Sequence, residues 1–124
     1  MTQLTKPLYG AFLLSAAWLL CVGQLSREGV DMKKIYIAGP MTGYENFNRD
    51  SFHSRANFIE KCGDAPLNPA ILPDGLTQAQ YMDICFAMLR AADAIYLLKG
   101  YEESKGAMAE LAYAEKLELE VVEL

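Results

Sequence analysis

Hydrophobic and polar positions from residue 33 onward follow two alternating patterns. Short runs rich in apolar and β-branched residues, bounded by Gly, Pro, Asn or Asp, predict strands at 33–38, 64–70, 94–98 and 119–124. Between them lie longer segments in which apolar residues recur every three or four positions, as on one face of a helix. This part of the chain therefore predicts seven elements in the order βαβαβαβ.

Three helices are predicted in the intervening segments. The first begins at Asp50 or Ser51, the second is capped near Thr77, and the third covers 106–116. Their apolar faces predict which side chains are buried. These are Phe52, Ala56 and Ile59 in the first helix, and Tyr81, Ile84, Cys85, Met88 and Ala92 in the second.

The alternation predicts an α/β domain with a doubly wound parallel sheet, covered on both faces. In such sheets, ligands bind outside the carboxyl ends of the strands. Three polar or glycine-containing segments lie there, at 39–43, 68–70 and 99–106. Every α/β domain needs loops at these positions, so the segments alone do not establish a site. The candidate substrate-binding residues in the first two are Gly39, Pro40, Met41, Thr42, Gly43, Asn68 and Pro69.

Residues 8–25 carry no charge, which is typical of a transmembrane helix. The segment also has the character of a signal-peptide core behind Lys6. If it is retained, the positive-inside rule keeps the following domain in the cytoplasm, anchored to the inner membrane. Alternatively, translation begins at Met32, directly before the first strand, and the product is cytoplasmic. The chain is therefore divided into a hydrophobic leader, 1–31, and a domain, 32–124.

Composition and charge argue against several functions. The formal net charge is -5 and no basic stripe is visible, so a nucleic-acid partner is not expected. The three cysteines form no CxxC pair, and the single histidine, His53, has no neighbouring ligand, so no metal site is expected. The odd cysteine count also predicts no disulfide framework, which suits a reducing compartment.

One carboxylate is conspicuous in residues 104–115, SKGAMAELAYAE. Glu110 lies in an otherwise apolar helical stretch and has no basic side chain three or four positions away. A buried carboxylate without a partner is costly, and such groups are often functional. Gly106 lies one turn earlier on the same face, and Ser104 precedes it at the helix N-terminus, which favours an anion. The alternative is a solvated Glu on the helix surface.

The segments IYIAGPMTG, AADAIYLL and SKGAMAELAYA resemble the nucleoside 2-deoxyribosyltransferase superfamily in their order and spacing. The resemblance covers essentially the whole domain and points to a small branch found often in phages and prophages. It implies a flavodoxin-like or Rossmann-like fold. It also implies cleavage or transfer at the N-glycosidic bond of deoxynucleosides or their 5′-monophosphates, without a metal ion or an organic cofactor.

The resemblance also assigns roles to residues. Glu110 falls on the nucleophile that attacks C1′ of the sugar, and Tyr36 falls on the residue that orients it. Gly39 and Pro40 fall in the loop that lines the substrate. Ser104 stands where the monophosphate hydrolases of the family have Ser, and this implies a 5′-phosphorylated substrate.

The chain departs from the family at one catalytic position. The family's second catalytic Asp corresponds to Cys85, and the nearest acid, Asp83, lies roughly 200° around the helix. Either the helix is rotated, or Asp83 protonates the leaving base instead, or that step is impaired. The alternative function is a non-catalytic module of a prophage accessory protein that binds a nucleotide or an ADP-ribose-type ligand.

The expected partner is a small-molecule nucleoside or nucleotide, with membrane contact only if residues 8–25 are retained. A homo-oligomer is also expected, for two reasons. Family sites often borrow residues from a neighbouring subunit, and the apolar residues Phe86, Met88 and Leu89 exceed the need of one core.

Overall fold

The structure, a computed structural model, describes residues 32–123. The predicted leader at 1–31, with its candidate membrane segment at 8–25, lies outside the described residues. The elements are β1 Lys34–Ala38, η1 Glu45–Asn48, α3 Arg49–Lys61, β2 Ala65–Leu67, η2 Pro69–Ile71, α4 Gln78–Arg90, β3 Ala94–Leu97, η3 Tyr101–Glu103, α5 Lys105–Lys116 and β4 Glu120–Glu123. Within this part of the chain, no helix combines the length and the apolar character that crossing a bilayer requires.

The predicted α/β class and parallel sheet are confirmed. The strands form one all-parallel sheet in the order β2-β1-β3-β4. This order matches the beginning of a flavodoxin-like, doubly wound sheet. After β1 the chain builds outward to β2 on one side, and it then returns to place β3 on the other side. The topological switch point therefore lies between the carboxyl ends of β1 and β3, where such folds bind ligands.

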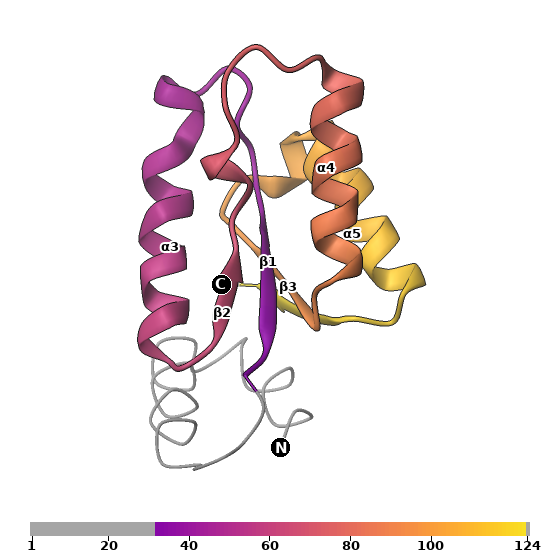
Figure 1. The fold of residues 1–124 in the computed structure, drawn as a ribbon. Helices are drawn as coiled ribbons and strands as arrows, with labels where there is room; N and C mark the ends of the chain where they lie inside the picture. The colour runs from indigo at the N-terminus through magenta and orange to yellow at the C-terminus, as the bar shows by residue number, and fades with distance from the viewer. Residues whose placement is uncertain (1–31, 124) are drawn as a thin grey trace.

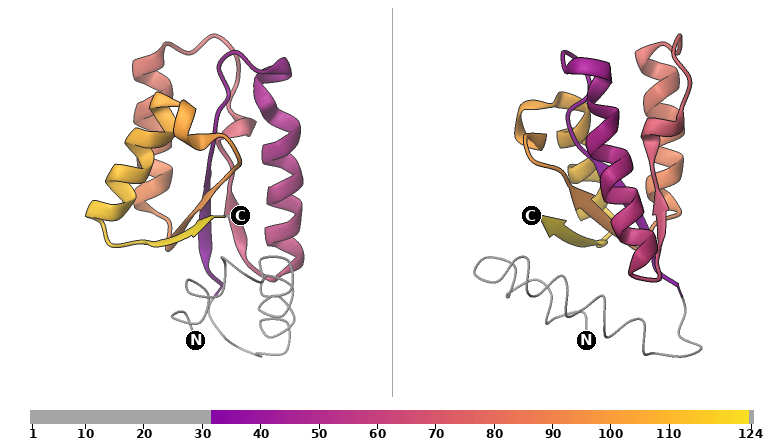
Figure 2. Two further views of the ribbon diagram at one scale, coloured as in Figure 1. Left: turned by 180° about the vertical axis from the view of Figure 1, so that it is seen from behind. Right: turned by 90° about the vertical axis from the view of Figure 1, so that its left-hand side faces the viewer.

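Side chains of the two central strands alternate between two cores. α4 and α5 cover one face of the sheet and α3 covers the other (Figures 1 and 2). Tyr36 and Ile95 belong to the core on the α4 and α5 side, whereas Ile37 and Tyr96 belong to the core on the α3 side. Every residue of β3 is buried, as is typical of an inner parallel strand. The alternation directs Tyr36 toward the helix that carries Glu110.

Local hydrogen bonds determine where two of the helices begin. At α4, Thr77 Oγ1 accepts from the Gln80 N–H at 3.1 Å, and Gln80 Oε1 accepts from the Thr77 N–H at 3.0 Å. This reciprocal capping box confirms Thr77 as the predicted cap. At α5, Ser104 Oγ accepts from the Ala107 N–H at 3.1 Å. This bond stabilises the first turn of the helix next to the predicted site.

The start of α3 differs from the prediction. Asp50 and Ser51 lie inside the helix, which begins at Arg49 and has no side-chain cap hydrogen bond from Asn48. Residues 46–48 instead form a left-handed turn, with φ angles of 50°, 55° and 61°. A capping pattern does not reveal such a turn, because none of the three residues is a glycine.

Two apolar roles predicted on α4 are wrong. Ile84 was expected to be buried but is 37% exposed, since it lies about 100° around the helix from the buried Cys85. Leu89 was expected to be available for an interface but is fully buried in the protein's own core, one turn after Cys85. Phe86 packs its ring against Tyr113, with centroids 4.9 Å apart. The homo-oligomer itself stays a prediction.

One cysteine also differs from the prediction. Cys62, directly after α3, is disulfide-bonded, whereas Cys85 is a free thiol. The odd cysteine count predicted no disulfide framework and gave no indication of this bond. Count and spacing do not reveal which cysteines the fold brings together. The inference of a reducing compartment loses this part of its support.

Candidate active site

A pocket of about 180 Å³ opens beside the switch point, among the segments that follow β1, β2 and β3. It lies where a doubly wound sheet binds its ligand. The predicted site residues that line it are Tyr36, Gly39, Met41, Thr42, Pro69, Ser104, Gly106 and Glu110. The other lining residues are Phe47, Arg49, Phe52, Pro73, Asp74, Gly75, Leu76, Gln78, Tyr81, Met82 and Ala107. The fold thus brings together residues from both ends of the domain.

Tyr36 and Glu110 form the innermost polar contact of the pocket. The Tyr36 hydroxyl donates a hydrogen bond of 2.9 Å to Glu110 Oε2. Tyr36 is fully buried, and Glu110 is only 5% exposed. The bond exists because β1 directs Tyr36 toward α5 and because Glu110 lies one turn inside that helix. The resemblance implied a hydrogen bond between these two residues, and their roles in catalysis stay predictions.

The surroundings of Glu110 alter its acidity. Burial raises the pKa of Glu110 from 4.5 to about 7, although hydrogen bonds from Tyr36 and Cys85 lower it in part. The pKa of Tyr36 lies well above its ordinary value, first because of burial and then because of the nearby Glu110. Near neutral pH, Glu110 is therefore present in both protonation states, while Tyr36 stays a neutral donor.

Cys85 completes the contacts around this pair. It is fully buried on α4, and its thiol is close enough to Tyr36, Tyr81 and Glu110 for each of them to shift its pKa. Burial raises the pKa of the Cys85 thiol to about 11, so it remains protonated near neutral pH. α4 is therefore not rotated to bring an acid inward. Asp83 is exposed and is not among the residues that line the pocket.

Two of the three glycines that line the pocket, Gly39 and Gly106, differ in why glycine is present. A Cβ on Gly39 would lie 2.8 Å from Leu98 Cβ, so the packing of the loop after β1 against β3 requires a glycine there. A Cβ on Gly106 would make only ordinary contacts, at 3.6 Å from Met82 Sδ and 3.9 Å from Ser104 Oγ. The protein's own packing does not demand glycine at Gly106, and its absent side chain leaves the start of α5 open to the pocket.

Four predicted site residues lie outside the lining. They are Pro40, Gly43, Asn68 and Asp83. Asn68 has a structural role instead, because its Oδ1 accepts from the Ala70 N–H at 2.9 Å and its Nδ2 lies 3.1 Å from His53 Nδ1. These bonds hold the turn after β2 in place, and Pro69 in the same turn reaches the pocket.

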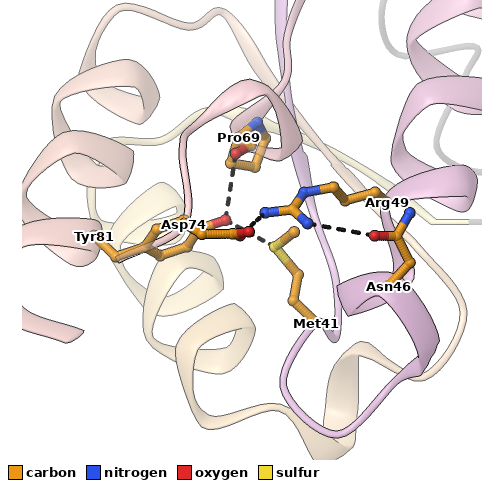
Figure 3. A network of polar contacts seen from close by, with 6 residues as sticks. All are labelled: Met41, Asn46, Arg49, Pro69, Asp74 and Tyr81. Carbon is orange, nitrogen blue, oxygen red and sulfur yellow. Dashed lines mark hydrogen bonds and ion pairs between the residues drawn. The ribbon is translucent and has the colours of Figure 1, made fainter. Parts of the chain in front are cut away.

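The sequence did not predict the network of polar contacts around Arg49, which Figure 3 shows. Arg49 Nη2 lies 2.6 Å from Asp74 Oδ1, and Arg49 Nη1 lies 3.4 Å from Asn46 Oδ1. Nearby, the Tyr81 hydroxyl lies 2.7 Å from Met41 Sδ. No spacing rule indicates these contacts, since Arg49 and Asp74 come from separate segments. Arg49 is the only cation among the described residues that line the pocket.

Fold and pocket together define a small α/β protein with a buried carboxylate–phenol pair at a topological switch point. The chain belongs to the family described as "Domain of unknown function (DUF4406)", whose model matches residues 33–123. This match includes every strand of the sheet and every residue that lines the pocket. No curated protein matches the sequence. Among residues 32–123, no group of three or more His, Cys, Asp or Glu side chains is placed to hold a metal ion.

Proposed function

We propose that this protein cleaves or exchanges the N-glycosidic bond of a deoxynucleoside or nucleoside 5′-monophosphate, and that its family is a branch of the nucleoside 2-deoxyribosyltransferase superfamily. The observation that carries the proposal is the 2.9 Å hydrogen bond from Tyr36 to Glu110 beside an open pocket. A buried carboxylate that faces a pocket and has an orienting donor suits nucleophilic attack.

The proposed reaction has two steps. First, an ionised carboxylate oxygen of Glu110 attacks C1′ of the sugar, and a C1′–O bond forms as the C1′–N bond breaks. The electron pair of the broken bond leaves with the base, which takes up a proton. Next, water or a second base attacks C1′, releases Glu110 and loses a proton. The hydrogen bond from Tyr36 keeps the carboxylate in position throughout.

Protonation of the leaving base is the weakest part of the site. Asp83 faces solvent outside the pocket, and Cys85 is a poor acid because burial raises its thiol pKa to about 11. The pocket is open to water, so we infer that the departing base takes its proton from solvent. A slow reaction is expected, because no strong general acid assists the leaving group.

Ser104 and the first turn of α5 are the proposed site for the sugar end of the substrate. The Ser104 hydroxyl lines the pocket and already accepts from Ala107, which leaves its own proton for a ligand. The N–H groups at the start of a helix favour an anion, and Gly106 leaves that helix end accessible. These features support a 5′-phosphorylated substrate over a free nucleoside.

Cys85 also favours a second candidate function. A pocket with Glu110 and Tyr36 but no acid on α4 can bind a nucleotide or an ADP-ribose-type ligand without cleaving it. In that function, Glu110 would accept hydrogen bonds from the ligand rather than attack it. The two functions differ in a single outcome, the release of free base.

The deciding experiment incubates the full chain with a panel of deoxynucleosides and their 5′-monophosphates and follows free base by chromatography. The enzyme proposal predicts base release by the wild type that Glu110→Gln abolishes. Binding of a nucleotide in calorimetry without base release over a day would support the binding module instead. Base release that persists in Glu110→Gln would remove Glu110 from the mechanism.

A further inference from the structure

We infer that Arg49 is the anion receptor of this pocket, and that Asp74 is an internal counter-ion which a phosphate monoester on the substrate displaces. The inference rests on the proposed function because it concerns the same pocket, and it names the substrate class as phosphorylated. Ser104 and the helix end offer hydrogen bonds but no formal charge. Arg49 supplies the positive charge that distinguishes a nucleotide from a nucleoside.

Contacts with neighbouring side chains fix the position of the Arg49 guanidinium before a ligand binds. Its guanidinium lies over the ring of Phe47, 5.2 Å from the ring centroid, and is directed toward Asp74 (Figure 3). A weaker contact of 3.4 Å joins it to Asn46. Its side chain is only 21% exposed, so little conformational freedom remains to be lost on binding. The guanidinium fork matches the oxygens of a phosphate in a way that a lysine does not.

Asp74, by contrast, is easily displaced. Its side chain is 76% exposed and lies in the loop before α4. Ion pairs with such an exposed partner contribute little to stability, because water competes for both groups. A phosphate dianion carries more charge than the Asp74 carboxylate and can accept two bonds from the guanidinium. Exchange of Asp74 for the phosphate is therefore favourable.

The backbone before Arg49 supports the same role. Residues 46–48 have positive φ angles, which Asn46 and Asn48 adopt readily but which are unfavourable for Phe47. Asn48 Nδ2 donates to the Pro40 carbonyl at 2.9 Å and ties this turn to the loop after β1. Phe47, within the turn, and Arg49, directly after it, both line the pocket. Strain of this kind is typical of segments that position functional side chains.

The overall charge makes a local receptor necessary. The chain has a formal net charge of -5, so its long-range field repels a nucleotide. Among the described residues that line the pocket, only Arg49 opposes this field. Removing its charge should therefore weaken the binding of a phosphorylated ligand much more than the binding of a neutral one.

The test is calorimetry on the full chain with a nucleoside 5′-monophosphate and with its nucleoside, at one ionic strength. Arg49→Gln should bind the monophosphate at least about tenfold more weakly and the nucleoside within about twofold of wild type. Asp74→Asn should bind the monophosphate about three- to fivefold more tightly, because the competing carboxylate is gone. That gain should vanish in the Arg49→Gln background, where no guanidinium remains to be freed.

Arg90→Gln is the matched control, since it removes one exposed positive charge outside the pocket. Both affinities should stay within about twofold of wild type. Equal losses for nucleoside and monophosphate in Arg49→Gln would overturn the inference, and so would an unchanged monophosphate affinity. Arg49→Lys, which keeps the charge, should retain part of the preference. If monophosphate binding depends on Arg49 but no base is ever released, this inference stands and the proposed function fails.

Discussion

Tyr36 and Glu110 are 74 positions apart in the chain, yet a buried hydrogen bond of 2.9 Å joins them. Two opposing influences meet at this bond. Burial raises the pKa of Glu110, whereas the donors on Tyr36 and Cys85 lower it. Because the two hydrogen bonds that lower the pKa come from different residues, single substitutions can separate their contributions.

Glu110→Gln should abolish base release while keeping the fold. The amide preserves the shape of the side chain but lacks the nucleophilic charge, so turnover should fall by about 10³-fold or more. Single-turnover release of free base measures the effect, and calorimetry should still detect nucleotide binding. Glu115→Gln, an exposed change on the same helix, serves as the control and should keep wild-type turnover.

Glu110→Gln should also change how the free energy of unfolding depends on pH. The folded-state pKa of Glu110 is raised from 4.5 to about 7, so its contribution is fully present below pH 4.5 and is lost as pH rises through about 7. Above pH 7 the wild type holds a buried charge, which Gln lacks. Glu110→Gln should therefore be more stable at pH 8 by roughly 1–3 kcal/mol. Urea unfolding at pH 5 and pH 8 checks this, and an equal effect at both values would contradict it.

Tyr36→Phe should move the pH profile of the reaction. If ionised Glu110 is the nucleophile, kcat/KM rises with pH through the carboxyl pKa, near 7 in the wild type. Loss of the Tyr36 donor raises that pKa further, so the acid limb should move to higher pH. Tyr101→Phe removes a hydroxyl that bonds Glu123 outside the pocket and should leave the limb in place. A downward movement in Tyr36→Phe would contradict the role of the hydroxyl.

Substitution of Cys85 should move the pH profile, whereas substitution of Asp83 should have little effect on the reaction. Cys85→Ala removes a donor to Glu110 and should also move the acid limb upward, by less than Tyr36→Phe. Cys85→Ser keeps a donor and should restore the acid limb of the pH profile to its wild-type position.

Asp83→Asn should leave kcat and kcat/KM within about twofold, because Asp83 is exposed outside the pocket. A large fall in kcat for Asp83→Asn would return it to the mechanism.

Leu89 and Ile84 provide a test of the fold on one helix. Leu89 is fully buried between α4 and the sheet, so Leu89→Ala should lower the free energy of unfolding by about 2–5 kcal/mol. Ile84 is 37% exposed, and Ile84→Ala should cost less than about 1 kcal/mol. Urea denaturation gives both values. Similar costs would mean that α4 packs with a different face inward.

Local patterns in the sequence determined the order of elements and the fold class. Apolar periodicity depends only on neighbouring residues, so the strands and helices could be predicted together with the cap at Thr77. The parallel order then located the ligand site at the carboxyl end of the sheet, where Gly39 and Ser104 line the pocket. Glu110 could be predicted as a buried acid, since the residues around it on the helix are apolar.

The tertiary structure decided which residues from distant segments are in contact and which face of each helix is buried. Periodicity does not say that Arg49 reaches Asp74, because the two come from segments with no local relationship. It also misjudged Ile84 and Leu89, since the buried stripe of a helix is chosen by its partners as well as by its own pattern. The left-handed turn at 46–48 has no glycine to indicate it. The hydrogen bond from Asn48 to the Pro40 carbonyl ties that turn to the loop after β1, and Arg49, directly after the turn, lines the pocket.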